Sequence, residues 1–263
     1  MIQLSLLFFF IIGTAVGSFL NVVAHRSVHG GSVFFDNSRC PHCRHNLAAK
    51  DLIPLVSFLT LRGKCAYCRK KISPQYPFVE IATGVLFALT FLYWSNTVLG
   101  LMELIYLLFF VSVLIVLFTT DVVDGLLPNS VVLPAIAAVT IYKMILVAAG
   151  TMSFSVFTTD LLIAFVVAGV FFAIVAVSAE RAMGGGDVKL AFLIGLAVGW
   201  PAVLVAVFTS FLTGAIVAVM LILIGKKRFG QSVPFGPFLS FGALIAVFWG
   251  REIIDLYLRA ITA

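Results

Sequence analysis

Long, uninterrupted apolar runs dominate this chain of 263 residues. Most of them are roughly 20 residues long, which is the length of an α-helix that crosses the hydrocarbon core of a bilayer. Hydrophobic residues make up 62% of the chain and charged residues only 11%, whereas a soluble domain carries about 25% charged residues. The mean hydropathy is +1.17. The pattern therefore predicts an integral membrane protein and excludes an ordinary soluble domain.

The apolar runs are continuous, whereas the strands of an outer-membrane barrel alternate apolar and polar residues. We therefore predict an all-α fold, a polytopic membrane helix bundle of about eight transmembrane helices. The first run lacks a basic n-region and a small-residue cleavage site, so it is expected to remain as a helix. A turn at Trp200-Pro201 divides the run that begins at residue 188. The expected spans are residues 2–24, 77–95, 98–119, 129–149, 157–178, 188–200, 201–224 and 234–250.

Lysine and arginine residues are unevenly distributed between the two sides of this predicted bundle. If eight helices begin with the N-terminus outside, 14 cations fall on the inner side and three near the outer side. The three outer cations are Lys143, Arg251 and Arg259. The inner set is Arg26, Arg39, Arg44, Lys50, Arg62, Lys64, Arg69, Lys70, Lys71, Arg181, Lys189, Lys226, Lys227 and Arg228. The bias places these loops in the cytoplasm. The net charge of +6 thus reflects membrane orientation and does not indicate a nucleic-acid partner.

All four cysteines lie in the first large polar loop, which covers roughly residues 25–75. They form two Cys-x-x-Cys pairs separated by 21 residues, Cys40, Cys43, Cys65 and Cys68. Each such turn directs two thiolates at one ion, and four thiolates complete a closed tetrahedron, so we predict a structural Zn²⁺ in a cytoplasmic zinc-binding loop. Two disulfides or a redox pair are alternatives, which a reducing cytoplasm disfavours. His42 or His45 could also replace one cysteine ligand.

Two acidic segments interrupt the apolar runs, at residues 121–128 and 183–190. A charge at membrane depth costs on the order of a few kcal/mol unless it is paired or solvated, so both segments are candidate functional sites. Asp121 is expected on the last turn of the third span, and Asp124 in the turn that follows it. Ordinary turn or capping roles would also explain both residues.

Three glycines precede Asp187 in the second segment. Glycine removes side chains where a backbone approaches another group closely or adopts a positive φ. We hypothesise that Gly184 and Gly186 form an active-site loop through which a substrate backbone approaches Asp187. The aspartate itself is expected to open the sixth helix, where the helix dipole stabilises a carboxylate. A role as a plain N-cap would explain it equally, whereas the P-loop spacing of a phosphate site is missing.

Two carboxylates that reach one water can divide acid and base work between them. Like charges held close together do not both ionise readily, so the pair shares a proton. The ionised member takes a proton from water, which attacks a peptide carbonyl, while the protonated member donates toward the developing oxyanion. All four histidines lie in the first loop, so no Ser-His or Cys-His pair competes. Asp121 and Asp187 therefore predict peptide hydrolysis at the membrane boundary.

Two further classes of function are compatible with parts of the chain. An ion-coupled transporter would use broken helices and acidic groups near the midplane of paired halves, and the chain shows neither feature. A membrane thiol oxidoreductase would use the Cys-x-x-Cys pairs, and a measurement of bound zinc separates that reading from a structural site.

Beyond these local patterns, the chain resembles the bacterial type IV prepilin peptidases, also called prepilin leader peptidase/N-methyltransferases. Residues 184–187 resemble the Gly-x-Gly-Asp signature of membrane aspartyl proteases. The resemblance covers nearly the whole chain. It is carried by residues 17–26, both Cys-x-x-Cys pairs, residues 52–54, residues 72–77 with Glu80, Asp121 with Leu127-Pro128, residues 183–190 and residues 234–237.

The resemblance implies that Asp121 and Asp187 are the catalytic pair. Asp121 is preferred to Asp124 because it stands seven residues before the proline of Leu127-Pro128, as in the family motif. The family motif usually has an aspartate after that proline, and this chain has Asn129, which we interpret as an equivalent helix cap.

The same resemblance implies the reaction and its place in the cell. Expected substrates are prepilins and pseudopilins of type IV pili and type II secretion, whose short basic leader is removed at the cytoplasmic face of the bacterial inner membrane. The new N-terminus is then methylated with S-adenosylmethionine. The residues identify no methyl-donor pocket, and Glu80 is a candidate there that could equally pair with a cation of the loop. The resemblance does not predict an oligomeric state.

We divide the chain into three parts on this basis. Residues 1–24 are the first transmembrane helix, residues 25–76 the cytoplasmic loop with two zinc knuckles, and residues 77–263 the aspartyl peptidase domain. Asp160 is expected near the outer end of a span, in contact with solvent.

Overall fold

The computed structural model describes residues 2–33, 38–95, 100–181, 183–226 and 233–262. Lys227 and Arg228, two of the predicted inner cations, lie outside the described residues. Within the described ranges the regular structure is helical, apart from two isolated β-bridges in the cysteine loop. The all-α prediction is confirmed.

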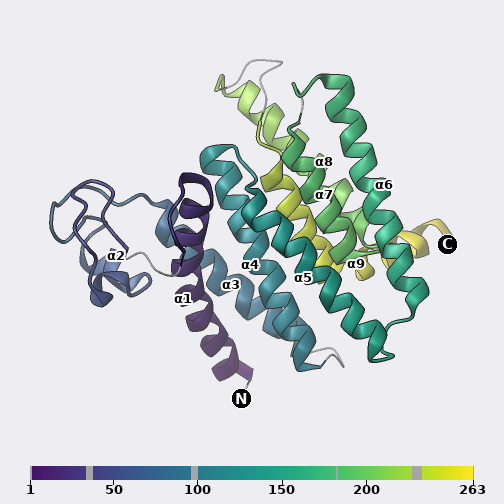
Figure 1. The fold of residues 1–263 in the computed structure, drawn as a ribbon, viewed down its shortest axis with the longest axis horizontal. Coiled ribbons are helices and arrows are strands. Elements are labelled where there is room, and N and C mark those ends of the chain that lie inside the picture. Colours follow the sequence, from purple (N-terminus) through teal and green to yellow (C-terminus); the bar gives the residue numbers. More distant parts are fainter. Residues whose placement is uncertain (1, 34–37, 96–99, 182, 227–232, 263) are drawn as a thin grey trace. The chain divides into compact units, whose positions relative to one another are not determined.

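Every predicted span corresponds to a helix, and two short helices lie in the first loop (Figure 1). The helices are α1 (Ile2–His29), η1 (Ala49–Leu52), α2 (Val56–Thr60), α3 (Gln75–Ser95), α4 (Leu101–Asp124), α5 (Asn129–Ala148), α6 (Phe154–Ser178), α7 (Gly185–Val198), α8 (Val203–Leu223) and α9 (Gly236–Thr262). Seven of those described are long and apolar enough to cross a membrane. The exception among the predicted spans is α7, which has 14 residues.

The chain divides into two compact units, Met1–Thr119 and Thr120–Ala263. In the first unit, α1 packs closely on α3 through small residues. A Cβ added at Gly13 would lie 2.7 Å from the Cα of Gly84, and one added at Gly17 would lie 2.8 Å from the Cα of Glu80. Glycines at such a seam let the helix backbones approach, which is how helices associate when lipid removes the hydrophobic driving force.

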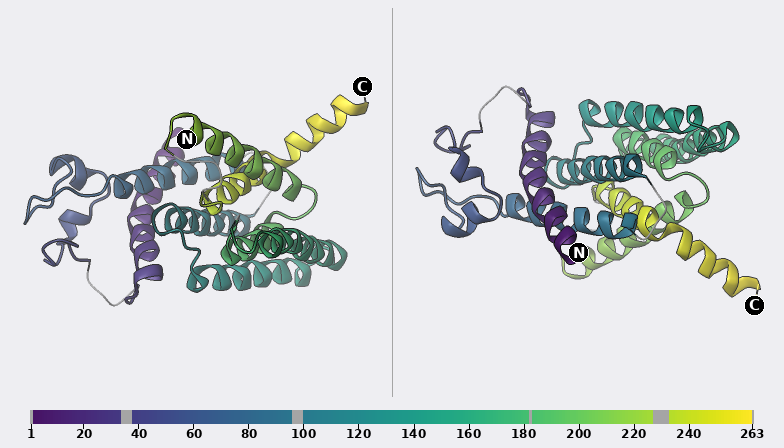
Figure 2. Two further views of the ribbon diagram at one scale, coloured as in Figure 1. Left: turned by 90° about the horizontal axis from the view of Figure 1, so that it is seen from above. Right: turned by 90° about the horizontal axis from the view of Figure 1, so that it is seen from below.

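The second unit consists of the end of α4 and helices α5 to α9. Helix α7 packs on α6, α5 and α9, and the views of Figure 1 and Figure 2 show α6 and α7 side by side. Leu190, Leu193 and Leu196 of α7 are fully buried. At 1.5 Å per residue a helix of this length is about 21 Å long, less than the hydrocarbon core of about 30 Å. Other helices therefore surround α7, and it ends early at the turn made by Gly199, Trp200 and Pro201.

A buried ion pair lies where α7 ends. Asp160 on α6 is 5% exposed, and its Oδ2 lies 2.5 Å from Nζ of Lys143 on α5. Its Oδ1 accepts a hydrogen bond of 3.1 Å from the N–H of Trp200. The expectation that Asp160 is solvated was wrong, because a cation on the neighbouring helix compensates its charge inside the bundle. Three segments thus meet at one carboxylate.

Helix α9 is longer than the predicted span 234–250. It continues to Thr262 and extends beyond the other helices of its unit (Figure 2). Its final turns carry both charged and apolar exposed side chains, including Arg251, Asp255 and Leu256.

Candidate functional site

The two predicted aspartates line one cavity of the second unit. Asp121 lies on the last turn of α4 and Asp187 in the first turn of α7, and each side chain is buried, with 6% of its residue surface exposed. The cavity has a volume of about 470 Å³. Its lining residues are Asp121, Gly125, Leu126, Leu127, Asn129, Glu180, Arg181, Met183, Gly184, Gly185, Gly186, Asp187, Lys189, Val233, Pro234 and Phe235. Residues from segments 121–129, 180–181, 183–189 and 233–235 therefore meet around the two carboxylates.

The start of α9 holds Asp121 in place. The backbone N–H of Gly236, the first residue of that helix, donates a hydrogen bond to the carboxylate. A Cβ at this position would lie 2.7 Å from Oδ2 of Asp121, so a glycine is required for the close approach. Oδ2 is buried and has no hydrogen-bond partner among the described residues. This buried oxygen therefore lacks a donor among the described residues.

Asp187 belongs to a capping box at the start of α7. The N–H of Gly184 donates to Oδ2 of Asp187 over 3.1 Å, and the N–H of Asp187 returns a bond of 3.1 Å to the carbonyl of Gly184. Burial raises the pKa of the Asp187 carboxyl from 3.8 to about 6; the Gly184 hydrogen bond opposes this shift, and the negative charge of Asp121 adds to it. The two aspartates therefore interact electrostatically.

The three glycines differ in what surrounds them. A Cβ on Gly185 would meet no atom within 4 Å, and one on Gly184 would meet only the N atom of Gly186 at 4.0 Å. A Cβ on Gly186 would lie 3.0 Å from Cβ of Leu127. Gly184 and Gly185 thus leave space open beside Asp187, whereas Gly186 makes room for a side chain of the same unit.

Polar groups at the rim of the cavity complete the site. Nζ of Lys189 donates a hydrogen bond of 2.8 Å to Oδ1 of Asn129, which joins the first turns of α7 and α5. Glu180 and Arg181 also line the cavity, and Glu180 has a positive φ of 61°. Asp124 is not among the described residues that line it. The family resemblance included Leu127 and residues 234–237, but no local pattern predicted that Leu127 and Gly236 would lie beside the segments that hold the aspartates.

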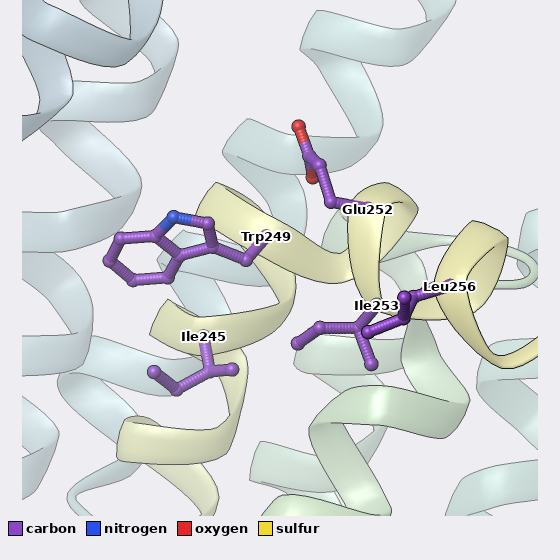
Figure 3. Close-up of a pocket in the computed structure, with 5 residues that line it drawn as sticks. All are labelled: Ile245, Trp249, Glu252, Ile253 and Leu256. Carbon is purple, nitrogen blue, oxygen red and sulfur yellow. The ribbon is translucent and has the colours of Figure 1, made fainter.

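A second cavity, of about 350 Å³, lies along α9 and offers no comparable chemistry (Figure 3). Its described lining residues all come from this one helix: Ile245, Trp249, Glu252, Ile253 and Leu256. The single carboxylate of Glu252 points away from the apolar side chains in the figure. Of these two cavities, the one that Asp121 and Asp187 line is the one with paired acidic groups.

The four predicted cysteine ligands meet in the first unit. Their sulfur atoms all lie within 4.8 Å of one another, and all four are free thiols, so neither disulfide of the alternative reading is formed. Cys40 and Cys65 are buried and Cys43 is exposed. This group could hold a metal ion, and it contains neither His42 nor His45.

The two Cys-x-x-Cys turns have the same backbone geometry. The N–H of Arg44 donates to the carbonyl of Cys40 over 2.9 Å, and that of Arg69 donates to the carbonyl of Cys65 over 3.0 Å. The two arginines have φ values of 58° and 59°, in a backbone region that residues other than glycine rarely adopt. An isolated β-bridge closes each turn. Two equivalent knuckles thus present their thiols to one point.

Clustering changes the pKa values of two of these thiols in opposite directions. Although burial opposes ionisation of Cys40, hydrogen bonds from the backbone of Cys43 and His42 lower its pKa to about 7. A hydrogen bond from the backbone of Lys70 favours the Cys68 thiolate, yet burial and the neighbouring sulfurs raise its pKa to about 11. Four clustered thiols cannot all ionise unless a positive ion balances them. The donor set fits a metal that prefers four thiolates.

Glu80 of α3 anchors the cysteine loop to the helices of its unit. This carboxylate is 7% exposed, and its Oε2 accepts a hydrogen bond of 2.8 Å from the N–H of Leu55. The side chain of Ser18 provides a second hydrogen bond. Glu80 was expected either to serve methyl transfer or to pair with a cation of the loop. The loop does supply its partner, but that partner is the backbone N–H of Leu55 and not a cation.

Comparison with known proteins agrees with this geometry. Residues 11–94 match the bacterial peptidase A24 N-terminal domain, and residues 108–219 match the type IV leader peptidase family. A prepilin leader peptidase/N-methyltransferase of Bacillus subtilis (strain 168) is 32% identical over 267 residues, which cover 98% of each chain. The chain belongs to the type IV leader peptidase family.

Other relatives in this leader peptidase family carry the same name. Proteins of Stutzerimonas stutzeri and Pseudomonas aeruginosa are 31% and 30% identical, each over 95% of this chain and 92% of the relative. Both are called prepilin leader peptidase/N-methyltransferase. No solved structure matches the chain. The chain is thus a multi-pass membrane protein of a peptidase family.

Proposed function

We propose that this protein is a membrane aspartyl endopeptidase that removes the leader of prepilins and pseudopilins, with Asp121 and Asp187 as its catalytic pair. The observation that carries the proposal is the meeting of two buried carboxylates, from α4 and α7, in one cavity. Each carboxylate contacts the first turn of a helix, whose dipole stabilises negative charge.

The pair would hydrolyse a peptide bond through one water. The ionised aspartate accepts a proton from the water, and the water oxygen bonds to the carbonyl carbon of the substrate. The protonated aspartate gives its proton to the carbonyl oxygen, which forms a tetrahedral diol. When this intermediate collapses, the C–N bond breaks, the nitrogen takes up a proton and the pair again shares one. The shared proton belongs to the pair and not to either residue.

The open side of the glycine loop provides a route for the substrate. Gly184 and Gly185 leave space beside the Asp187 carboxylate, so an extended peptide could pass there with its backbone close to the pair. Gly186, in contrast, makes room for Leu127 inside the protein.

The cysteine group would bind a structural Zn²⁺ through Cys40, Cys43, Cys65 and Cys68. Four thiolates leave no open coordination position, so the ion would stabilise the loop and take no part in hydrolysis. Its binding energy would contribute to the folding of a loop with few buried residues of its own.

N-methylation of the new N-terminus with S-adenosylmethionine is proposed from the relatives, whose names include an N-methyltransferase. Glu80, the earlier candidate, is engaged by Leu55 and Ser18. We therefore assign Glu80 to anchoring the cysteine loop.

The proposed location is the bacterial inner membrane, with the catalytic cavity and the cysteine loop facing the cytoplasm. The distribution of lysine and arginine supports this orientation. Asp121 ends α4 and Asp187 begins α7, so both lie at the helix ends that this orientation assigns to the cytoplasmic side.

The test is cleavage of a prepilin by membranes that contain wild type, Asp121→Asn, Asp187→Asn or Asp124→Asn. Each of the first two variants should lose cleavage by about a thousandfold or more, because asparagine cannot exchange a proton. Asp124→Asn should cleave normally and serves as the matched acidic control. An active Asp121→Asn protein would refute the assignment of the pair.

A further inference from the structure

The turn between α4 and α5 lies against both backbone segments that serve the aspartates. Leu127 is the contact on one side, since its Cβ lies 3.0 Å from the position that a Cβ on Gly186 would occupy, one residue before Asp187. On the other side, its Cδ2 lies 3.2 Å from the corresponding position on Gly236, whose N–H binds Asp121. One side chain thus fills the space between the two supports.

The same turn is connected to α7 by a polar contact. Asn129, the first residue of α5, accepts a hydrogen bond of 2.8 Å from Nζ of Lys189. Lys189 and Asp187 are two residues apart on α7, so their side chains leave opposite faces of the helix. The lysine is therefore placed to hold Asn129 and not to pair with the catalytic carboxylate.

We propose that segment 127–129 fixes the separation of the two aspartates, with Leu127 as a spacer and the Lys189–Asn129 hydrogen bond as a tether. Leu127 resists closure of the gap between Gly186 and Gly236. The hydrogen bond resists its opening, because it joins the residue that begins α5 to the first turns of α7. Leu127, Asn129 and Lys189 are positioning residues, since they act through the backbone of the acids.

This inference rests on the proposed aspartyl mechanism and explains how its geometry is held. Two acids that share a proton are effective over a narrow range of separation, and a displacement of about 1 Å can reduce the rate of an enzyme by about a hundredfold. An exposed hydrogen bond contributes little to folding stability. The effect is therefore expected in the reaction and not in the stability of the fold.

The test compares Asn129→Ala with Ser130→Ala, an exposed neighbour on the same helix that is not among the described cavity-lining residues. Both changes leave the net charge of the protein unaltered, so Glu180, Arg181 and Lys189 exert the same charges on the cavity. We expect Asn129→Ala to lower kcat for prepilin cleavage about tenfold with a small change in KM. Ser130→Ala should behave as wild type.

The pH–rate profile gives a readout that a general loss of folding would not move. When two acids separate, they repel each other less, and the shared proton is lost at lower pH. The basic limb of the profile should therefore shift to lower pH in Asn129→Ala, which loses the tether. It should shift to higher pH in Leu127→Ala, which loses the spacer and lets the acids approach each other. Lys189→Arg keeps a donor and the charge, and it should recover most of the activity that Lys189→Met loses.

The outcomes separate the two proposals. If Asp121→Asn and Asp187→Asn are inactive while Asn129→Ala has the wild-type kcat and profile, the spacer and tether are refuted and the catalytic pair is retained. A rise in KM alone in Lys189→Met, with Asn129→Ala unaffected, would overturn the tether in favour of a direct contact with substrate. Activity in the aspartate variants would remove the basis of both proposals.

Discussion

The backbone N–H of Gly236 donates a hydrogen bond to the carboxylate of Asp121, although the two residues are separated by more than one hundred positions in the sequence. The contact brings the first turn of α9 against the last turn of α4. Only a residue without a side chain permits it, because a Cβ would lie 2.7 Å from Oδ2.

Gly236→Ala should therefore reduce cleavage while the protein still inserts and folds. The added methyl group displaces the Asp121 carboxylate, so we expect a decrease in kcat of about a hundredfold. Gly169→Ala is the matched control, because a Cβ at that helical glycine of α6 meets no atom within 4 Å. Normal cleavage by Gly236→Ala would show that the position of Asp121 is not critical.

Gly185→Ala tests whether the substrate passes over the glycine loop. A methyl group at this position meets no protein atom within 4 Å, so it should leave the fold unchanged. A clash with a bound peptide should instead raise KM about tenfold. Steady-state cleavage of a prepilin peptide decides the matter, and an unchanged KM would place the substrate elsewhere.

The pH dependence of cleavage should follow the shared proton. Burial raises the pKa of Asp187 to about 6, so the proton needed for hydrolysis is lost at about pH 6 or above and not near 4. The rate should fall on both sides of an optimum, at low pH because both acids are protonated and at high pH because both are ionised. Measuring kcat/KM between about pH 4 and 9 tests this, and a flat profile would contradict it.

Removing either partner of the Lys143–Asp160 pair should destabilise the protein. Lys143→Met leaves a buried, uncompensated carboxylate, which costs about 3–5 kcal/mol. The double variant Lys143→Met with Asp160→Leu should recover part of that loss, although the N–H of Trp200 then lacks its acceptor. Thermal unfolding in detergent measures both effects, and equal stability of the single variant and wild type would contradict the expectation.

Zinc should be present in a ratio of about one ion per chain and should depend on the four cysteines. Cys65→Ser removes one of the four thiolate ligands, so the protein should lose the ion. The first loop should then become accessible to proteases, because metal binding contributes to its folding. His42→Ala is the control, and it should retain zinc because the group of four sulfurs does not include this side chain. Elemental analysis of purified protein with limited proteolysis provides the measurement.

Much of the architecture follows from the residues themselves. Runs of apolar residues as long as a bilayer is thick locate the helices, and the spacing of the cysteines brings four thiols together. The acidic segments could be identified because a carboxylate among apolar residues costs free energy and therefore indicates a function. The prediction of Asp121 and not Asp124 as the functional residue required the family resemblance, since spacing alone does not distinguish the two aspartates.

Other features depend on contacts between distant segments. From the sequence, Lys143 and Asp160 are each predicted to be charges near a membrane surface. Their pairing depends on how α5 and α6 pack in the folded protein. The ends of α1 and α9 extend beyond the apolar runs because polar residues continue the helix past the hydrocarbon region. Catalytic roles for Asp121 and Asp187 and the three-part division of the chain remain predictions.

The Lys143–Asp160 pair also bears on how firmly α7 is held. It joins α5 and α6, and through Trp200 the end of α7, at the helix ends opposite those that carry Asn129 and Asp187. Helix α7 is therefore held at both of its ends, by Asn129 through Lys189 at the start and by Asp160 through the N–H of Trp200 beyond the end. We expect spin labels near the starts of α5 and α7, and labels beside Trp200, to keep their distances when a peptide binds.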